Sequence, residues 1–213
     1  MANVLVFGAS IVQGFHDTRG GWVNRLKNDL LKYSRENNYK KDLKIYNLGI
    51  SGDTSTDVLK RFDHEVKPRN WKSQKTIVIF AIGINDTILI NGKLKTPEAK
   101  FRKNLETLSQ KAGKFSEYTI FVGPSPVVES RVGPMPWSPT ESYHNKNIRH
   151  YDKIIKNFCA KKGHVYIEVF SKFWERDYEK LLPDGVHPNP AGHKLMFKII
   201  KESLMKNKLL QDF

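Results

Sequence analysis

Short apolar runs alternate with amphipathic segments along nearly the whole chain. Residues 3–7, 43–48, 76–82, 118–122 and 165–169 are short runs rich in Val, Ile, Leu and Phe, which predicts strands. Between and after them, apolar residues recur every three or four positions, which predicts helices around 22–33, 58–66, 101–115, 148–158 and 195–204. Thr96-Pro97 and Asn189-Pro190 are typical of helix starts. This order predicts one α/β domain over residues 1–213, with a five-stranded parallel sheet covered by helices on both faces.

The predicted sheet indicates where a ligand would bind. In parallel sheets of this kind, ligands bind beyond the carboxyl ends of the strands. The expected site is therefore built from the segments that follow Phe7, Leu48, Ile82 and Val122. Residues 124–143 hold half of the ten prolines and form the most irregular stretch of the chain. A long irregular segment in a compact domain is usually functional, and we expect it to form a wall of the site.

Composition and charge narrow the classes of function. No apolar run approaches the ~18 residues of a membrane span, and residues 1–7 lack the features of a secretory signal. The single cysteine, Cys159, excludes an intrachain disulfide, and a reduced, cytoplasmic setting is expected. The net charge of +14 raises the question of nucleic-acid binding. The Lys and Arg residues are scattered, however, so no specific nucleic-acid partner is expected.

A candidate nucleophile follows the first predicted strand. Gly8-Ala9-Ser10 is a small-residue turn that can present a serine hydroxyl at the sheet edge. Alone the pattern is weak, because Gly-x-Ser also caps many ordinary helices. The segment lacks the Gly-Lys-[Ser/Thr] ending of a phosphate-binding loop and the third glycine of a dinucleotide fingerprint. A nucleophilic role for Ser10 requires a base and a group that orients the base.

His187 is the favoured base among seven histidines. It lies in the loop 184–188, Asp-Gly-Val-His-Pro, with Asp184 three residues before it. The glycine permits a sharp turn, in which the carboxylate of Asp184 can reach the ring Nδ1 and orient the imidazole. Glu141 and His144 form a rival pair at the same spacing. That pair is predicted to open a helix, where Glu141 suits the first turn.

Acyl transfer also needs donors for a developing oxyanion, and two strand ends offer them. Gly52 follows the second strand and could present its backbone N–H. Asn85 follows the third strand and could present its side-chain amide. Each has an ordinary alternative, Gly52 as a turn residue and Asn85 or Asp86 as a helix cap. Four such signals at four strand ends or facing loops favour the functional interpretation.

Taken together, these motifs resemble the SGNH/GDSL hydrolase superfamily. They are Gly-Ala-Ser at 8–10, Gly-Ile-Ser-Gly at 49–52, Gly-Ile-Asn-Asp at 83–86 and Asp-Gly-Val-His-Pro at 184–188, and they span nearly the whole chain. The resemblance implies a three-layer α/β/α, flavodoxin-like fold that needs no metal or other cofactor. It also implies a serine ester hydrolase in which Ser10 is the nucleophile, His187 the base and Asp184 its orienter. The Ser10 N–H, the Gly52 N–H and the Asn85 amide would form the oxyanion hole.

The sequence departs from the family pattern at one position, where Ala9 replaces the usual aspartate. The missing carboxylate normally helps to hold the loop that carries the serine. A non-catalytic binding module therefore stays open beside the esterase. The net charge of +14 leaves a nucleic-acid-binding protein open as a third alternative. The expected substrate is a small or medium-sized carboxylic ester, with a thioester or an acetylated carbohydrate as alternatives. The oligomeric state is not predicted. Residues expected to line the substrate site are His16, Asp17, Met135, Trp137 and Tyr143.

Overall fold

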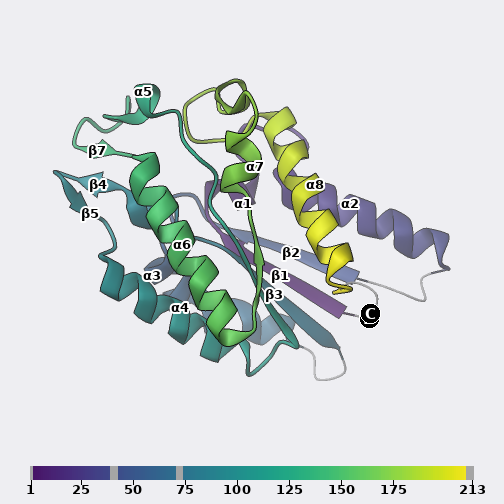
Figure 1. The fold of residues 1–213 in the computed structure, drawn as a ribbon. Coiled ribbons are helices and arrows are strands. Elements are labelled where there is room, and N and C mark those ends of the chain that lie inside the picture. Colours follow the sequence, from purple (N-terminus) through teal and green to yellow (C-terminus); the bar gives the residue numbers. More distant parts are fainter. Residues whose placement is uncertain (1, 39–42, 71–73, 210–213) are drawn as a thin grey trace.

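The computed structural model describes residues 2–38, 43–70 and 74–209. The remaining residues of the expected 1–213 domain, which are 1, 39–42, 71–73 and 210–213, lie outside the described part. The main sheet has five parallel strands in the order β2-β1-β3-β6-β8 (Figure 1). Its strands are β1 (Ala2–Gly8), β2 (Leu43–Gly49), β3 (Lys75–Ala81), β6 (Tyr118–Val122) and β8 (Val165–Ile167). The predicted α/β class, with a flavodoxin-like five-stranded parallel sheet, is confirmed.

Helices cover both faces of this sheet (Figure 1). One face carries a core cluster that includes Trp22, Leu26 and Ile200, from helices α2 and α8. The other face carries a cluster that includes Phe62 and Leu105, from helices α3 and α4. The helices are α1 (Ser10–Gln13), α2 (Gly21–Glu36), α3 (Ser55–Val66), α4 (Glu98–Ala112), α5 (Glu129–Val132), α6 (Asn145–Lys162), α7 (Phe170–Trp174) and α8 (Pro190–Lys206).

The central strands are aligned by a row of aromatic side chains. Phe7 of β1 lies in register with Phe80 of β3, which in turn lies in register with Phe121 of β6. Their ring centroids are 5.7 and 5.2 Å apart, a spacing typical of favourable aromatic pairs. All three rings are fully buried. The row therefore fixes the register of three strands whose carboxyl ends carry the candidate site.

One of the two predicted helix starts differs in detail from the sequence prediction. Asn189 caps α8 as predicted, because its side chain accepts hydrogen bonds from the N–H groups of Ala191 and Gly192. The helix expected at Thr96 begins at Glu98 instead. The Thr96 side chain does not cap this helix, because it hydrogen-bonds to the Asp86 carboxylate, and the Thr96 N–H donates to the backbone carbonyl of Asp86.

Several short elements carry too little periodicity to be predicted. A small antiparallel sheet joins β4 (Leu89–Ile90) to β5 (Lys93–Leu94) and β7 (Glu141–Ser142). Three 3₁₀ turns are η1 (Lys67–Arg69), η2 (Asn85–Thr87) and η3 (Tyr178–Leu181). The prediction that Glu141 opens a helix is wrong. Glu141 pairs with Ile90 in the small sheet, and α6 starts only at Asn145.

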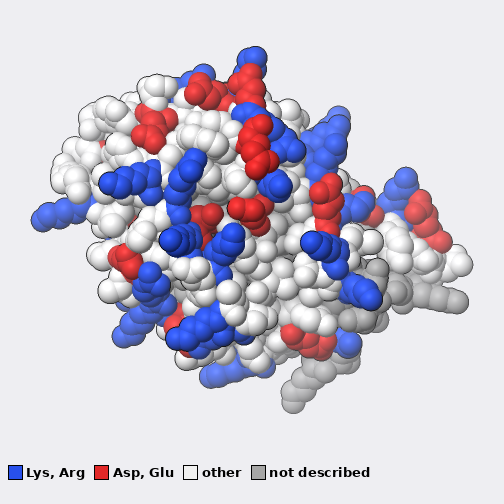
Figure 2. Space-filling model, viewed as in Figure 1, with Lys and Arg blue, Asp and Glu red and all other residues white. Residues whose placement is uncertain are grey.

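The surface is basic but mixed. On the face shown in Figure 2, Lys and Arg side chains are spread over the molecule with Asp and Glu among them. Many of the charges are locally paired, such as Lys162 with Glu106 and Arg102 with Glu98. In the described part of the chain, no helix is both long enough and apolar enough to cross a bilayer.

Candidate active site

Ser10 opens the short helix α1, directly beyond the carboxyl end of β1. Its neighbour Gly8 is required by close packing, because a Cβ there would lie 2.6 Å from the backbone oxygen of Ala81 on β3. Ser10 is a buried residue, with 8% of its surface exposed. The nucleophile candidate is thus held at the boundary between β1 and β3, where the strand order reverses.

The loop between η3 and α8 brings a histidine to this serine from 177 residues away. His187 Nε2 lies 2.8 Å from Ser10 Oγ, and His187 Nδ1 lies 2.5 Å from Asp184 Oδ2. Gly185, with φ of 91°, supplies the left-handed turn that folds Asp184 back onto the ring. The structure therefore brings together Ser10, His187 and Asp184 in one hydrogen-bonded chain.

Asp184 is built to stay ionised. Its Oδ1 accepts the backbone N–H groups of Val186 and His187, at 2.9 and 2.7 Å. Burial works to raise the pKa of Asp184, but the bonds from the ring and backbone of His187 and from Val186 outweigh it. The pKa of Asp184 is therefore held well below its ordinary value. A charged Asp184 makes Nδ1 of His187 the protonated nitrogen, which leaves Nε2 to accept the Ser10 hydroxyl.

Asn85 opens the turn η2 after β3, and both ends of its amide are engaged. Its Oδ1 accepts the hydroxyl of Tyr143 at 2.7 Å, and one Nδ2–H donates to the backbone oxygen of Asp53 at 2.9 Å. Burial raises the pKa of Tyr143 well above its ordinary value, so its hydroxyl stays protonated. These two bonds fix the amide orientation and leave the second Nδ2–H for another acceptor. Gly52, at φ of 82°, lines the same cavity as Asn85.

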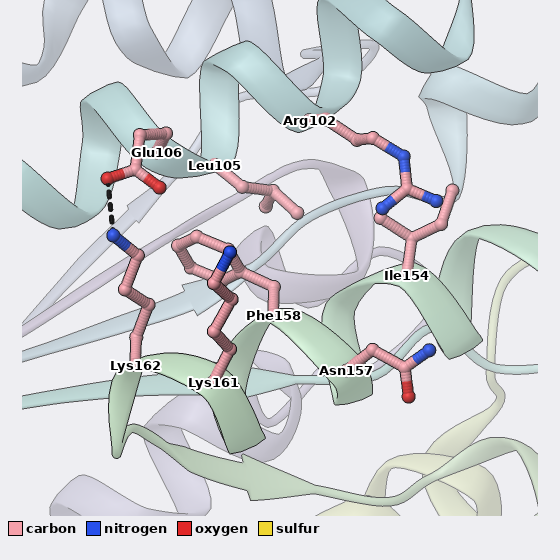
Figure 3. A pocket seen from close by; sticks show the side chains of 8 residues that line it. All are labelled: Arg102, Leu105, Glu106, Ile154, Asn157, Phe158, Lys161 and Lys162. Atoms are coloured by element: carbon pink, nitrogen blue, oxygen red, sulfur yellow. Dashed lines mark hydrogen bonds and ion pairs between the residues drawn. The ribbon is translucent and has the colours of Figure 1, made fainter.

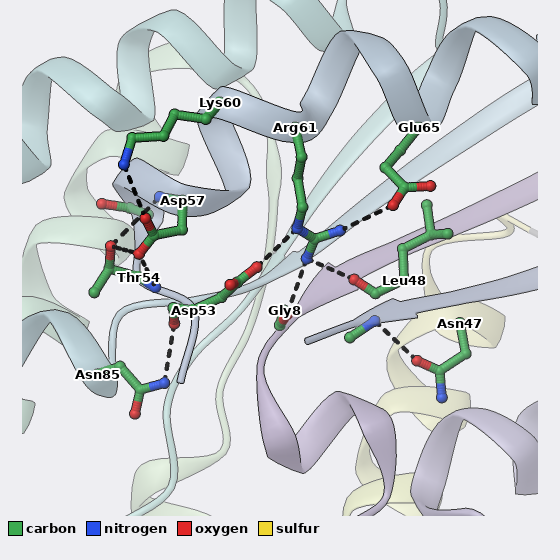
Figure 4. A network of polar contacts seen from close by, with 12 residues as sticks. Gly8, Asn47, Leu48, Asp53, Thr54, Asp57, Lys60, Arg61, Glu65 and Asn85 are labelled. Atoms are coloured by element: carbon green, nitrogen blue, oxygen red, sulfur yellow. Dashed lines mark hydrogen bonds and ion pairs between the residues drawn. The ribbon is translucent and has the colours of Figure 1, made fainter. Parts of the chain in front are cut away.

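Arg61 of α3 ties the loops of the site together (Figure 4). Its guanidinium donates to the backbone oxygens of Gly8 and Leu48, at 3.2 and 2.7 Å, and to Asp53 Oδ2 at 2.7 Å. Burial raises the pKa of Asp53 above its ordinary value, although the charge and hydrogen bond of Arg61 oppose this. Arg61 thus holds the ends of β1 and β2 at a position near Ala9, where the family aspartate is missing. This contact could not be predicted from the sequence, because it joins residues 53 positions apart.

A second buried carboxylate supports the Asn85 turn. Asp86 is fully buried and accepts the backbone N–H and the hydroxyl of Ser55 at the first turn of α3. Burial raises the pKa of Asp86, while its hydrogen bonds from Ser55 oppose the shift. Asn104 of α4 donates to the same Ser55 hydroxyl at 2.9 Å. Asp86 therefore connects the third strand end to α3, rather than capping its own segment.

A cavity of about 540 Å³ opens over the candidate residues. Four of the predicted substrate-lining residues, His16, Met135, Trp137 and Tyr143, contribute to its wall. The last three come from the proline-rich segment 124–143, as predicted. The full lining is Ser10, Phe15, His16, Ser51, Gly52, Asn85, Ile88, Lys95, Met135, Trp137, Glu141, Tyr143, Asp184 and His187.

The prediction for Asp17 is wrong. Its side chain is fully buried, lies outside the lining of this cavity, and forms a 2.7 Å ion pair with Arg25 of α2. Burial works to raise the pKa of Asp17, but the bonds from Arg19 and Arg25 outweigh it and lower the pKa. Asp17 therefore anchors the segment after α1. The adjacent residue, His16, does line the cavity. A turn places adjacent side chains on different sides of the chain, so the position of Asp17 next to His16 does not predict where its side chain lies.

The rival pair, Glu141 and His144, does not form. The His144 ring lies 3.1 Å from the Ser142 hydroxyl and 3.5 Å from a Glu129 carboxylate oxygen. His144 is the residue directly before the first turn of α6. Glu141 lies in β7 of the small sheet and contributes to the wall of the cavity.

One cluster could attract a metal ion on composition alone. His16, Asp184 and His187 each offer a ligand atom within 4.8 Å of the others. The Asp184 oxygen lies 2.5 and 3.0 Å from the two ring nitrogens. Ligand atoms around a tetrahedral zinc ion are separated by about 3.3 Å, given metal–ligand distances near 2.0–2.1 Å. The present spacing fits hydrogen bonding.

A second hollow, of about 240 Å³, lies between α4 and α6 (Figure 3). Its lining is long charged side chains over an apolar floor, and Lys162 pairs with Glu106 at its edge. It holds none of the motif residues, so the chemistry described above belongs to the cavity at the carboxyl edge of the sheet. The lining is Arg102, Leu105, Glu106, Ile154, Asn157, Phe158, Lys161 and Lys162.

The fold is that of the SGNH hydrolases, and solved structures with the same architecture cover almost the whole chain. A lipase/acylhydrolase from Enterococcus faecalis is 22% identical, covers 97% of each chain and gives a TM-score of 0.76. The acetylxylan esterase Axe2 from Geobacillus stearothermophilus is 19% identical, covers 95% of this chain and 94% of its own, and gives 0.75. LAE5, an alpha/beta hydrolase enzyme from the metagenome of Lake Arreo, is 19% identical at the same coverage, with 0.73.

The chain belongs to the GDSL-like lipase/acylhydrolase family, whose model matches residues 6–195. The resemblance inferred from the four motifs is thereby confirmed. A search of curated proteins finds no significant match. The family makes this chain a hydrolase of the esterase and acylhydrolase type.

Proposed function

We propose that this protein is a serine ester hydrolase in which Ser10, His187 and Asp184 form the catalytic triad. The observation that carries the proposal is the continuous hydrogen-bonded chain from Ser10 Oγ through the His187 ring to Asp184, at 2.8 and 2.5 Å. The three hydrogen-bonded residues line the 540 Å³ cavity. A hydroxyl paired with an oriented imidazole is the arrangement that activates serine for attack.

The first half of the reaction forms an acyl-enzyme. Ser10 Oγ attacks the ester carbonyl carbon while its proton passes to His187 Nε2. Asp184 stabilises the resulting imidazolium through Nδ1. The tetrahedral intermediate then breaks its bond to the alcohol oxygen, which takes the proton from Nε2. The alcohol leaves, and Ser10 remains as an ester of the acid.

The second half returns the enzyme to its starting state. A water molecule gives a proton to His187 Nε2 as its oxygen attacks the acyl carbon. The bond to Ser10 Oγ then breaks, and the proton on Nε2 returns to this oxygen. The free acid leaves, and no redox change or cofactor is involved.

The oxyanion formed in both steps needs fixed donors. We assign this role to the backbone N–H groups of Ser10 and Gly52 and to the free Nδ2–H of Asn85. The assignment is supported by the two hydrogen bonds that fix the Asn85 amide and by the position of all three residues at the same cavity. Preorganised donors of this kind contribute about 2.7–4 kcal/mol each to transition-state stabilisation.

The wall of the cavity favours a short acyl group on a larger, polar alcohol. Phe15, Ile88 and Met135 supply apolar surface in the cavity that the triad residues line, while Lys95 and Glu141 place opposite charges in the same wall. Trp137 is 55% exposed and offers an aromatic face on which a sugar ring can stack. An acetylated carbohydrate is therefore the proposed substrate class, which agrees with the activity in the name of the similar acetylxylan esterase. Thioesters are the runner-up.

Substitution of the triad tests the proposal. Ser10→Ala and His187→Ala should each reduce the hydrolysis of p-nitrophenyl acetate by at least about a thousandfold. Ser109→Ala is a matched control, because Ser109 also contacts a histidine, His164 at 2.6 Å, but lies outside the cavity. A fluorophosphonate probe should label the wild-type chain at Ser10. Full activity in either triad variant would refute the assignment.

A panel of acyl groups separates the remaining alternatives. We expect acetyl esters and acetylated xylo-oligosaccharides to exceed octanoyl esters and acyl thioesters in kcat/KM. Higher values for the thioesters would make this a thioesterase. Tight binding of acetylated sugar without turnover or labelling would indicate the binding module suggested by Ala9. A salt-sensitive shift of random DNA or RNA would support the nucleic-acid alternative.

A further inference from the structure

A second histidine contacts the aspartate of the proposed triad. His16 Nε2 lies 3.0 Å from Asp184 Oδ2, the same oxygen that His187 Nδ1 contacts at 2.5 Å. The two imidazole rings are 5.7 Å apart and nearly perpendicular. Phe15 packs against both, with centroid distances of 4.6 and 4.7 Å. The Asp184 carboxylate therefore receives four donors, two from backbone and two from imidazoles.

The backbone at His16 is held in the left-handed conformation by its neighbours. Its φ is 62°, in the left-handed region that is uncommon for residues other than glycine, although histidine adopts it more often than most side chains do. The neighbouring residues fix it on both sides. The Phe15 N–H donates to the Ser10 carbonyl, the Phe15 carbonyl accepts from the His193 ring, and buried Asp17 pairs with Arg25. Such strain persists only where the surroundings enforce it, and it is concentrated at functional sites.

The protonation state of the pair follows from the chemistry of Asp184. An ionised carboxylate has only acceptors, so each ring nitrogen in contact with it must carry a proton. Nε2 of His16 is therefore a donor to Oδ2, in competition with Nδ1 of His187. This second donor restricts the carboxylate and withdraws part of its charge from the catalytic imidazole.

We propose that His16 is a positioning residue of the triad, whose Nε2–H holds the Asp184 carboxylate in the orientation that serves His187. The inference rests on the proposed serine-esterase mechanism. By sharing Oδ2, His16 also weakens the attraction between Asp184 and the imidazolium form of His187. His187 then releases its proton to the leaving alcohol more readily.

Other ionisable groups face this cluster and have to be kept constant. Lys95, Glu141 and Tyr143 line the same cavity from the segments around the small sheet. His193 of α8 interacts electrostatically with His187, and burial lowers the pKa of His193, so this ring stays neutral. Single substitutions at His16 leave all four groups in place, which makes the comparison interpretable.

Two amide substitutions at His16 separate hydrogen bonding from backbone strain. In His16→Gln, the side-chain nitrogen stands as many bonds from the backbone as Nε2 does, so the donor is retained. In His16→Asn, the amide is one bond too short, but asparagine tolerates a positive φ better than glutamine does. The proposal therefore predicts that Gln is the better substitute, whereas strain alone predicts that Asn is.

We expect His16→Asn to lower kcat on p-nitrophenyl acetate about threefold to tenfold, the effect of one hydrogen bond, with KM changed less than about twofold. Without the competing donor, the acidic limb of its kcat/KM profile should move to higher pH. His16→Gln should restore kcat to within about twofold of wild type. His150→Asn, at an exposed histidine on α6 paired with Glu98, is the control and should leave both parameters unchanged.

Three results would overturn the proposal: an unchanged pH profile and kcat in His16→Asn, a change confined to KM, or higher activity in His16→Asn than in His16→Gln. Loss of activity in Ser10→Ala together with any of these would reject the role of His16 alone. Full activity in Ser10→Ala would instead reject the esterase mechanism on which it depends.

Discussion

Arg61→Gln is expected to lower both the stability of the fold and the rate of hydrolysis. Arg61 donates to two strand-end carbonyls, of Gly8 and Leu48, and to the Asp53 carboxylate. The side chains of Arg61 and Asp53 are only 15% and 12% exposed, so solvent screens their interaction weakly. Glutamine cannot span these three acceptors, and Asp53 would be left as a largely buried carboxylate without its cation.

These contacts set the expected loss in the free energy of unfolding. Breaking one partner of a fully buried pair costs about 3–5 kcal/mol, and the partial exposure here reduces this to about 2–4 kcal/mol. For a chain of this size, each kcal/mol shifts Tm by about 2–4 °C, so Arg61→Gln should lower Tm by about 4–16 °C. Because Arg61 sets the separation of the loops that carry Ser10 and Gly52, kcat should also fall by about tenfold or more.

Calorimetry and steady-state kinetics on p-nitrophenyl acetate measure both effects. Arg69→Gln is the matched control, since Arg69 pairs with Glu65 at 2.7 Å but is about twice as exposed, at 28%. Its cost should stay within about 1 kcal/mol. Asp53→Asn in the Arg61→Gln background should recover part of the stability, because it removes the unpaired carboxylate. Equal losses in Arg61→Gln and Arg69→Gln, or no recovery in the double variant, would refute this reasoning.

Three further outcomes are expected. Tyr143→Phe frees the amide of Asn85, so kcat should fall about threefold to tenfold at nearly constant KM, and an effect on KM alone would contradict this. Ala9 and Ser125 line a small cavity of about 30 Å³. The Ser125 hydroxyl is buried without a partner among the described residues, so Ala9→Ser should raise Tm by about 1–4 °C and Ala9→Val should not. The pKa of Asp184 is lower in the folded state than its value of about 3.9 in the unfolded chain, so the ionised carboxylate stabilises the fold above that pH and stops doing so as the pH falls through the folded-state pKa. Asp184→Asn should therefore flatten the loss of stability against urea that the wild type shows below about pH 5.

The strands and the long helices could be predicted from local pattern, because burial of one face imposes a period on the chain. The 118–122 strand coincides with β6, and the helix expected around 58–66 ends at Val66. The small sheet β5-β4-β7 was missed, since two-residue strands carry no period to detect. The segment that holds β7 was nevertheless expected to form a wall of the site, on the strength of its prolines.

At the site, sequence alone determined which residue types stand at which strand ends, and hence the family and the candidate chemistry. Each motif is local, and the parallel sheet brings its strand ends to a common edge. Only the tertiary structure decided what those residues touch. In the folded protein, His16 contacts Asp184, Asp17 is buried against Arg25, and Arg61 bonds to the ends of two strands. Side chains meet across such distances through the packing of whole helices and loops, and that packing leaves no periodic or positional trace in the sequence.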